Sequence, residues 1–375
     1  MKSEKVEKKV RKSGKADFVL VVIILCLLMF GLVMLFSASS PSALQSGNVY
    51  SIIVKQSSIS LIGCIGMIIA ANYDYHRFRK LSKALIIVCL ALMVLVPVIG
   101  FVSHGATRQI SLGPISFQPS ELSKFALIIY FASRFSEPKT ESLANNRKNI
   151  IQSFIIVGMF VATCFMQSHL SAAMVIGLIC LAMFIVAGLP MRIFWTFGGI
   201  GIAGMLGYGL TASYRLDRFR ALFNPFAYER GIGWQIIQSL YAVGSGGLFG
   251  LGLGQSRQKY RYLPEAHNDY IYAVICEELG FVGGIVVMLL FVALVWRGMS
   301  IALSAKDRLG MLMAFGITAV IGLQMLINIG VVLSVLPSTG MQLPFFSAGG
   351  TSMIVMLTGM GILLNISKSS RIKKL

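Results

Sequence analysis

The sequence predicts an all-α integral membrane protein with ten transmembrane helices. Its 375 residues are 56% hydrophobic and only 13% charged, and the mean hydropathy is +0.79. A water-soluble domain of this length could not bury so much apolar surface. The apolar residues also gather in separate stretches that are long enough to span about 30 Å of hydrocarbon.

Ten such stretches follow one another, and an even number places both chain ends on one side of the membrane. Residues 119–135 and 350–366 are short for a span, so they require tilt or support from neighbouring helices. The ten predicted helices cover residues 17–37, 51–72, 82–102, 119–135, 150–168, 171–189, 193–212, 269–296, 309–333 and 350–366.

The start of the chain resembles a cleaved signal peptide, with a basic tail, an apolar run and Ser37-Ala38-Ser39 as a cleavage site. The run from Phe18 to Phe36 is longer than the usual signal core of about 7–15 residues, and more spans follow. We therefore expect a retained first helix. The preceding residues 1–16 are predicted to form a disordered, basic cytoplasmic tail that contacts anionic membrane lipid.

The positions of the cations predict the orientation. With both termini in the cytoplasm, most of the 33 Lys and Arg residues lie in cytoplasmic segments, including a basic tail at 367–375, as the positive-inside rule requires. The formal net charge of +19 therefore reflects membrane topology, and we expect no nucleic-acid partner.

The predicted large outer loop between the seventh and eighth helices, residues 213–268, breaks this rule. Long loops cross the membrane largely regardless of charge, which is one explanation; an outward-facing site for an anionic ligand is the other. Its apolar, glycine-rich part, 236–254, is better explained as a re-entrant or interfacial segment than as an eleventh span. The cations of the loop are Arg215, Arg218, Arg220, Arg230, Arg257, Lys259 and Arg261.

Asp269 stands where this loop meets the eighth predicted helix. A simple helix cap would explain a carboxylate at that position, whereas the nearby Glu265, His267 and cations favour a functional site. Glu277 and Glu278 follow two turns deeper, where ionised carboxylates cost roughly 2.5–3.5 kcal/mol each. They must face a cavity or a cation or be protonated, and we expect them to orient neighbouring helices.

A second polar cluster combines Arg108 with residues 118–124. Pro119 suits a first helical turn, and Glu121 suits the positive end of the helix dipole. Glu121 and Lys124 are spaced i,i+3, which predicts a simple ion pair. A phosphate-facing Lys124 held by Glu121 is the alternative.

A third cluster, residues 336–352, holds two prolines and three glycines in an apolar outer segment. Such a composition predicts a broken segment that either lines a site or only packs. Elsewhere the six cysteines lie in apolar runs, and the four histidines lack ligand spacing. Sequence motifs of soluble ATPases, zinc proteases and serine hydrolases are missing, so those classes receive no support.

Several motifs, taken in order, resemble those of the SEDS family (shape, elongation, division and sporulation), and most of all its FtsW/SpoVE branch. The resemblance covers nearly the whole membrane region. The matching residues are Gln118-Pro119-Ser120-Glu121-x-x-Lys124, Arg218 with Asn224-Pro225, Gly233-x-Gln235-x-x-Gln238-Ser239, Gly244-Ser245-Gly246-Gly247, Gly250-x-Gly252-x-Gly254-x-Ser256-Arg257-Gln258-Lys259, Leu263-Pro264-Glu265, His267-Asn268-Asp269 and Leu343-Pro344-Phe345-x-Ser347-x-Gly349-Gly350-x-Ser352.

The resemblance implies a ten-helix peptidoglycan glycosyltransferase that polymerises lipid II outside the bacterial cytoplasmic membrane, at the division or sporulation septum. It implies a class B penicillin-binding transpeptidase and other divisome proteins as partners. The family's essential aspartate falls on Asp269, and its basic residues near the fourth helix fall on Arg108 and Lys124. The other expected substrate contacts are Gln118, Glu121, Arg218, Ser256, Lys259, Glu265 and His267.

The chain departs from the family pattern at three places. Gln109 follows Arg108 where Trp is frequent, and Ala348 replaces a Tyr. The familiar Gln-Pro-Asp-Leu-Gly-Thr reads Gln167-Ser168-His169-Leu170-Ser171-Ala172. No role of that carboxylate can therefore be carried over.

The chemistry of the implied substrate suits these residues. A diphosphate is already a good leaving group, so the site needs one base for the attacking hydroxyl and positive charge for the leaving oxygens. Asp269 is the expected base, or else a ligand of Mg²⁺ or Mn²⁺ that bridges the phosphates. A lipid II flippase and a non-catalytic divisome scaffold remain the alternative functions.

Overall fold

The computed structural model describes residues 14, 16–45, 47–103, 106–112, 115–137, 147–210, 213–229, 231–260 and 262–370. Most of the predicted tail 1–16, the end of the tail 367–375, and the cations Arg230 and Arg261 lie outside these residues.

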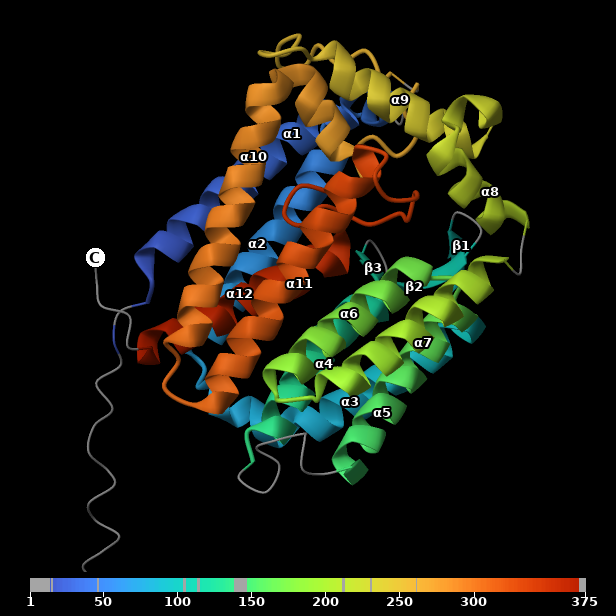
Figure 1. The fold of residues 1–375 in the computed structure, drawn as a ribbon. Coiled ribbons are helices and arrows are strands. Elements are labelled where there is room, and N and C mark those ends of the chain that lie inside the picture. The colour runs from blue at the N-terminus through green and yellow to red at the C-terminus, as the bar shows by residue number, and fades with distance from the viewer. Residues whose placement is uncertain are drawn as a thin grey trace, which may run out of the picture.

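The structure is mostly helical, and a helix occupies each of the ten predicted ranges (Figure 1). Within the described residues, seven helices are long and apolar enough to cross a membrane: α1, α2, α3 together with the short helix before it, α5, α10, α11 and α12. The chain is therefore a multi-pass membrane protein. The ten helices are α1 (Phe18–Gln45), α2 (Ser51–Asn72), α3 (Phe78–Ile99), α4 (Pro119–Phe135), α5 (Arg147–Met166), α6 (Leu170–Val186), α7 (Met191–Leu210), α10 (Ile271–Leu303), α11 (Arg308–Val332) and α12 (Gly350–Ser369).

These helices form two groups that lie side by side. One group contains α1, α2, α10, α11 and α12, and the other contains α3 to α7 (Figure 1). Helix α11 packs against both α4 and α6 and so joins the groups. Small residues allow close approach within a group: a Cβ atom added to Gly361 of α12 would lie 2.3 Å from the carbonyl oxygen of Met67 in α2.

Two regions differ from the predicted elements. The third predicted helix ends at Ile99, and the chain then forms a three-stranded antiparallel sheet of β1 (Phe101–Ser103), β2 (Ala106–Leu112) and β3 (Ile115–Phe117). Residues 213–268 also contain regular structure, namely α8 (Ser213–Phe223) and α9 (Ile232–Ser245). Both regions lie at the same end of the bundle (Figure 1).

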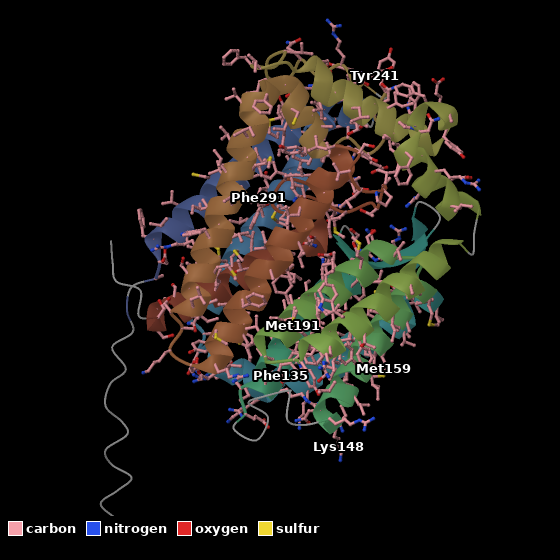
Figure 2. All side chains as sticks on the ribbon, in the orientation of Figure 1. Phe135, Lys148, Met159, Met191, Tyr241 and Phe291 are labelled. Atoms are coloured by element: carbon pink, nitrogen blue, oxygen red, sulfur yellow. The ribbon has the colours of Figure 1, made fainter. Side chains whose placement is uncertain are left out.

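The opposite end of the bundle carries both described chain ends. The carboxylate of Asp17 lies 2.9 Å from the guanidinium of Arg297, and the backbone N–H of Asp17 donates to Ser367 Oγ at 3.1 Å. Figure 2 shows Lys148 at this end and Tyr241 of α9 at the other. The start of α1 therefore lies beside the ends of α10 and α12.

Helix α10 is broken at Gly280, which has φ 67° and ψ −167°. The segment 247–252 crosses the break and replaces the missing helical hydrogen bonds. The N–H groups of Leu251 and Gly252 donate to the carbonyls of Glu277 and Glu278, each at 3.0 Å. In return, the N–H groups of residues 281 and 282 donate to the carbonyls of residues 247 and 248. Irregular backbone is stable inside a membrane protein only where such partners exist.

Candidate functional site

A cavity of about 390 Å³ opens between the two helix groups, at the end where α4 and α12 begin. Its walls come from β2, the starts of α4, α6 and α12, helix α8, the turn before α10, helix α11 and the segment after it. Seven of the predicted site residues line it: Arg108, Gln118, Glu121, Lys124, Arg218, Glu265 and Asp269.

One wall of the cavity is cationic. Lys124 lies one turn inside α4, with 1% of its side chain exposed, and its ammonium contacts the carboxylate oxygens of Glu121 at 2.7 and 2.8 Å. Glu121 also accepts a hydrogen bond from Ser352 of α12 at 3.2 Å. The predicted ion pair is thus confirmed, and it lines the cavity rather than the lipid surface.

Two arginines complete the positive side. Arg108 extends from β2 and donates to the carbonyl of Ser168 at 3.3 Å. Arg218 extends from α8 and donates to the carbonyl of Ser338 at 3.1 Å. Both arginines line the cavity.

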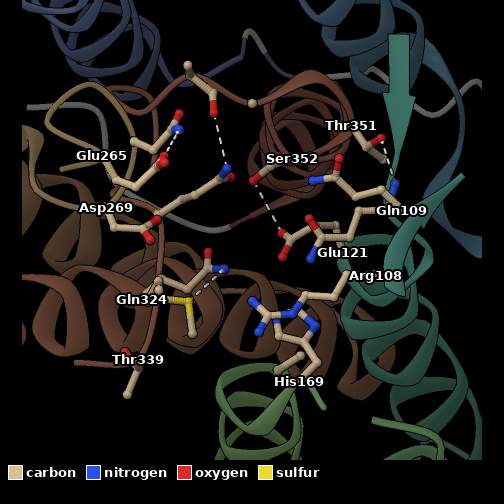
Figure 3. A pocket seen from close by; sticks show the side chains of 18 of the residues that line it. Arg108, Gln109, Glu121, His169, Glu265, Asp269, Gln324, Thr339, Thr351 and Ser352 are labelled. Carbon is tan, nitrogen blue, oxygen red and sulfur yellow. Dashed lines mark hydrogen bonds between the residues drawn. The ribbon is translucent and has the colours of Figure 1, made fainter. Parts of the chain in front are cut away.

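Asp269 lies on the opposite wall, in the turn that leads into α10 (Figure 3). Its backbone carbonyl accepts a hydrogen bond from Asn328 Nδ2 at 2.7 Å, and the same nitrogen donates to the carbonyl of Met341 at 2.6 Å. The amide of Asn328 therefore fixes the Asp269 turn and the 338–342 segment together.

Gly340 separates the acidic and basic walls. It has φ +68°, and a Cβ atom there would lie 3.3 Å from Asp269 Oδ2 and 4.0 Å from Arg108 Nη1. Any larger residue would be strained and would enter the space between the carboxylate and the guanidinium.

Glu265 lies beside Asp269 and is held by its own turn. The side-chain nitrogen of Asn268 donates to Glu265 Oε2 at 2.5 Å. Glu265 has φ 56°, a conformation that is uncommon outside glycine and asparagine. Figure 3 shows Glu265 and Asp269 on one side and Arg108, Glu121 and His169 on the other.

Three predicted substrate-binding residues do not line the cavity: Ser256, Lys259 and His267. Ser256 and Lys259 lie in a separate buried cluster, where Ser256 Oγ donates to Glu277 at 2.5 Å and Lys259 Nζ contacts Glu278 at 2.9 Å. This arrangement gives the two deep glutamates the partners that their burial requires.

His267 lies between the cavity wall and the segment before α12. Its carbonyl accepts a hydrogen bond from the N–H of Ala348 at 3.1 Å. Burial lowers the pKa of the His267 imidazole, and the Glu265 carboxylate opposes this shift in part. Through its backbone, His267 therefore joins the turn before α10 to the segment before α12.

The sequence analysis missed His169 and Gln324, which both line the cavity. Both side chains are buried, and each carries a polar atom, His169 Nδ1 and Gln324 Oε1, without a hydrogen-bond partner among the described residues. Buried polar atoms normally find partners, so these two atoms are exceptions within the residues that line the cavity. The only sequence signal was the altered motif around residue 169.

The described residues hold no cluster of three or more His, Cys, Asp or Glu side chains that could bind a metal ion. A purely protein-made metal site is thus not present in this part of the chain. Mg²⁺ often takes only one or two carboxylates and completes its shell with water and substrate phosphates. Asp269 could serve in that limited way.

Comparison with known proteins identifies the family. The model of the FtsW/RodA/SpoVE family of cell cycle proteins matches residues 18–372. The chain belongs to this family. Among its relatives, "Stage V sporulation protein E" of Bacillus subtilis is 43% identical over 363 residues, which cover 96% of this chain and 99% of that protein.

A second relative in the FtsW/RodA/SpoVE family is the "Probable peptidoglycan glycosyltransferase FtsW" of Geobacter sp. (strain M18). It is 38% identical over 358 residues, covering 95% of this chain and 97% of the relative. The identity extends over nearly the full length of both proteins, so it includes the cavity and both helix groups.

Two solved structures share the fold. A chain from a study described as "Structural coordination of polymerization and crosslinking by a peptidoglycan synthase complex" has a TM-score of 0.77 and 25% identity, covering 94% of this chain and 97% of that one. The rod shape determining protein RodA of Thermus thermophilus has a TM-score of 0.71 and 25% identity, covering 96% and 98%. The helical fold is therefore that of the family.

Proposed function

We propose that this chain is a peptidoglycan glycosyltransferase that polymerises lipid II into β-1,4 glycan strands on the outer face of the bacterial cytoplasmic membrane. The observation that carries the proposal is the cavity in which Asp269 faces Arg108, Lys124 and Arg218. The names of the FtsW relatives support the reaction class. The excess of cations at the cavity end supports an anionic substrate.

In this proposal the cavity binds the diphosphate of the donor. Arg108, Lys124 and Arg218 hold its oxygens, and positive charge placed before the reaction stabilises the leaving group as charge develops. Glu121 fixes the ammonium of Lys124 and keeps it at the cavity wall. Gln118 directly precedes α4, and its backbone N–H donates to Thr351 Oγ1 of α12 at 3.1 Å.

Asp269 acts as the general base. The 4-hydroxyl oxygen of the acceptor attacks the anomeric carbon of the donor, and the bond from that carbon to the diphosphate oxygen breaks with its electron pair. The hydroxyl proton passes to Asp269, and a single displacement converts the α-linked donor into a β bond. In the alternative with a bound divalent cation, Asp269 would supply one of the ligands of the cation, and the cation would neutralise phosphate charge.

The proposed membrane arrangement has ten spanning helices, both termini in the cytoplasm and residues 213–268 outside. Helices α4 and α6 have 17 residues each, which is short for an independent span, and α11 packs against both. A class B penicillin-binding transpeptidase is the proposed partner, because one structural relative comes from a complex that couples polymerisation to crosslinking. Other divisome proteins and a septal location are part of the same proposal.

Polymerisation of labelled lipid II by the purified chain tests this function, with and without a cognate class B transpeptidase. Glycan ladders from the wild type but not from Asp269→Asn would support it. Folded wild-type protein that transports lipid II across vesicles without forming ladders would support a flippase instead. A chain that forms no ladders and moves no lipid II, yet supports division after loss of Asp269, would be a scaffold.

A further inference from the structure

His169 is held rigidly at the rim of the cavity, directly before α6. Its backbone N–H donates to the carbonyl of Cys164 at 2.8 Å, and its own carbonyl accepts from the N–H of Ala173 at 3.2 Å. The preceding residue, Ser168, has φ 53° and offers its carbonyl to Arg108. The turn therefore holds the backbone of His169 beside the cationic wall.

The surroundings of the ring determine its charge. Only 5% of His169 is exposed, and its burial, together with the positive charges of Arg108 and Lys124, lowers the pKa of His169 to about 3. Near neutral pH the imidazole is therefore uncharged. It carries one N–H donor and one lone-pair acceptor.

The contacts of the ring indicate which nitrogen carries the proton. Nδ1 is buried and makes no hydrogen bond with any described residue, so a proton there would leave an N–H group without an acceptor and near two cations. Placing the proton on Nε2 avoids this cost. The ring lines the cavity, so that N–H is available to a ligand.

We propose that His169 is a substrate-binding residue that donates a hydrogen bond from Nε2 to a phosphate oxygen of the diphosphate held by Arg108 and Lys124. The inference rests on the proposed function, since it assigns one more contact to the same substrate. A neutral donor adds a directed hydrogen bond without cancelling the positive charge of its neighbours. A carboxylate at this position would instead accept hydrogen bonds from these cations.

The side-chain amides of Gln and Asn provide a matched pair of variants. The amide nitrogen of Gln can reach the place of Nε2, whereas that of Asn reaches only the place of Nδ1. His169→Gln is therefore expected to retain binding within about threefold. His169→Asn and His169→Leu are expected to weaken it by roughly tenfold to a hundredfold, the range for a lost hydrogen bond to a charged group.

The probe is undecaprenyl diphosphate, and the sample is the full chain in lipid nanodiscs. Affinity is measured by thermal shift and by competition against labelled lipid II. The Tm of each variant without ligand is measured as the reference. The expected order of affinity is wild type, Gln, then Asn and Leu. If His169→Leu unfolds, the comparison of the equally polar Gln and Asn variants still tests whether His169 donates this hydrogen bond.

Equal affinity of the Asn, Gln and wild-type proteins would overturn the inference. The failure of the proposed function has a different signature: wild-type protein that neither binds undecaprenyl diphosphate nor polymerises lipid II. Wild-type polymerisation, together with His169→Asn binding as tightly as wild type, would remove the role of His169 alone.

Discussion

Lys259 and Glu278 form an ion pair in the protein interior, with 2.9 Å between the ammonium and the carboxylate and no more than 1% of either side chain exposed. The ammonium also contacts Ser37 Oγ of α1 at 3.1 Å. The pair therefore ties the segment before Asp269 to α1 and to α10. A buried charge that loses its partner is costly, so this contact has a measurable consequence.

Lys259→Met is expected to destabilise the protein by about 3–5 kcal/mol, the cost of leaving a buried carboxylate without its partner. The double variant Lys259→Met/Glu278→Leu is expected to lose less than the sum of its single variants. Both losses of stability are measured by unfolding the detergent-solubilised protein. Arg220→Met is the matched control, because Arg220 pairs with Asp217 at the surface at 3.7 Å, where the loss should stay below about 1 kcal/mol. Unchanged stability together with lost substrate binding would instead make Lys259 a substrate ligand.

Asp269→Asn is expected to reduce lipid II polymerisation by about 10²–10⁴-fold, the usual contribution of a general base. The amide retains the shape of the carboxylate, and Asn328 holds the backbone of residue 269, so the variant should fold normally. Asp217→Asn on α8 is the control, and this variant should keep the polymerising activity. Full polymerisation by Asp269→Asn would exclude both the base and the metal-ligand roles.

Gly250→Ala is expected to destabilise the joint in α10. Gly250 has φ +81°, and an added Cβ atom would lie 2.1 Å from the carbonyl oxygen of Glu278, so the cost should be at least about 1–3 kcal/mol. Gly244→Ala in α9 is the control, since nothing lies within 4 Å of its added Cβ atom. Equal melting temperatures for the two variants would show that the crossing segment is not rigid.

The stability of the protein is expected to fall in mild acid partly because of His169. Its folded pKa of about 3 lies below the ordinary value of 6.5, so only the unfolded chain takes up this proton as the pH falls below about 6.5. The loss is at most about 1.4 kcal/mol per pH unit. Melting of wild type and His169→Gln from pH 8 to pH 5 isolates the contribution of His169, because any contribution of His267 is the same in both proteins. Parallel curves would show that the ring is solvated.

Divalent cations are expected to bind only with substrate. The described residues offer no three-ligand cluster, so Mn²⁺ should need phosphate oxygens to complete its shell around Asp269. Calorimetry should detect no Mn²⁺ binding by the protein alone and binding in the presence of undecaprenyl diphosphate. Tight binding without the diphosphate would reveal a protein-made site.

The sequence predicted the helices well because their signal is simple: an apolar stretch of sufficient length. The small sheet was missed because the apolar run before it continues into residues 101–102, and its strands are short. The turn-forming residues His104-Gly105 and Gly113-Pro114 could have indicated a hairpin there. With that signal, Arg108 would have been assigned to a strand.

The cavity was predicted in part. Asp269, Arg108 and the Glu121–Lys124 pair stood out because charges near a membrane are costly. Lys259 was predicted as a substrate contact, whereas the structure shows its ammonium paired with Glu278 in the interior. The argument that deep glutamates need a cation already pointed to such a partner. His169 could not be assigned, because neither its burial nor its neighbours can be read from a chain in which it lies 61 residues after Arg108.

The break at Gly280 has a mechanical consequence. Residues 247–252 hold both sides of the break, because they exchange backbone hydrogen bonds with residues 277 and 278 before it and with residues 281 and 282 after it. Bilayers of different thickness tilt spanning helices, and the crossing segment would then resist a change of angle at Gly280. The Asp269 turn would therefore move with the whole of α10, as one body, when the thickness of the surrounding lipid changes.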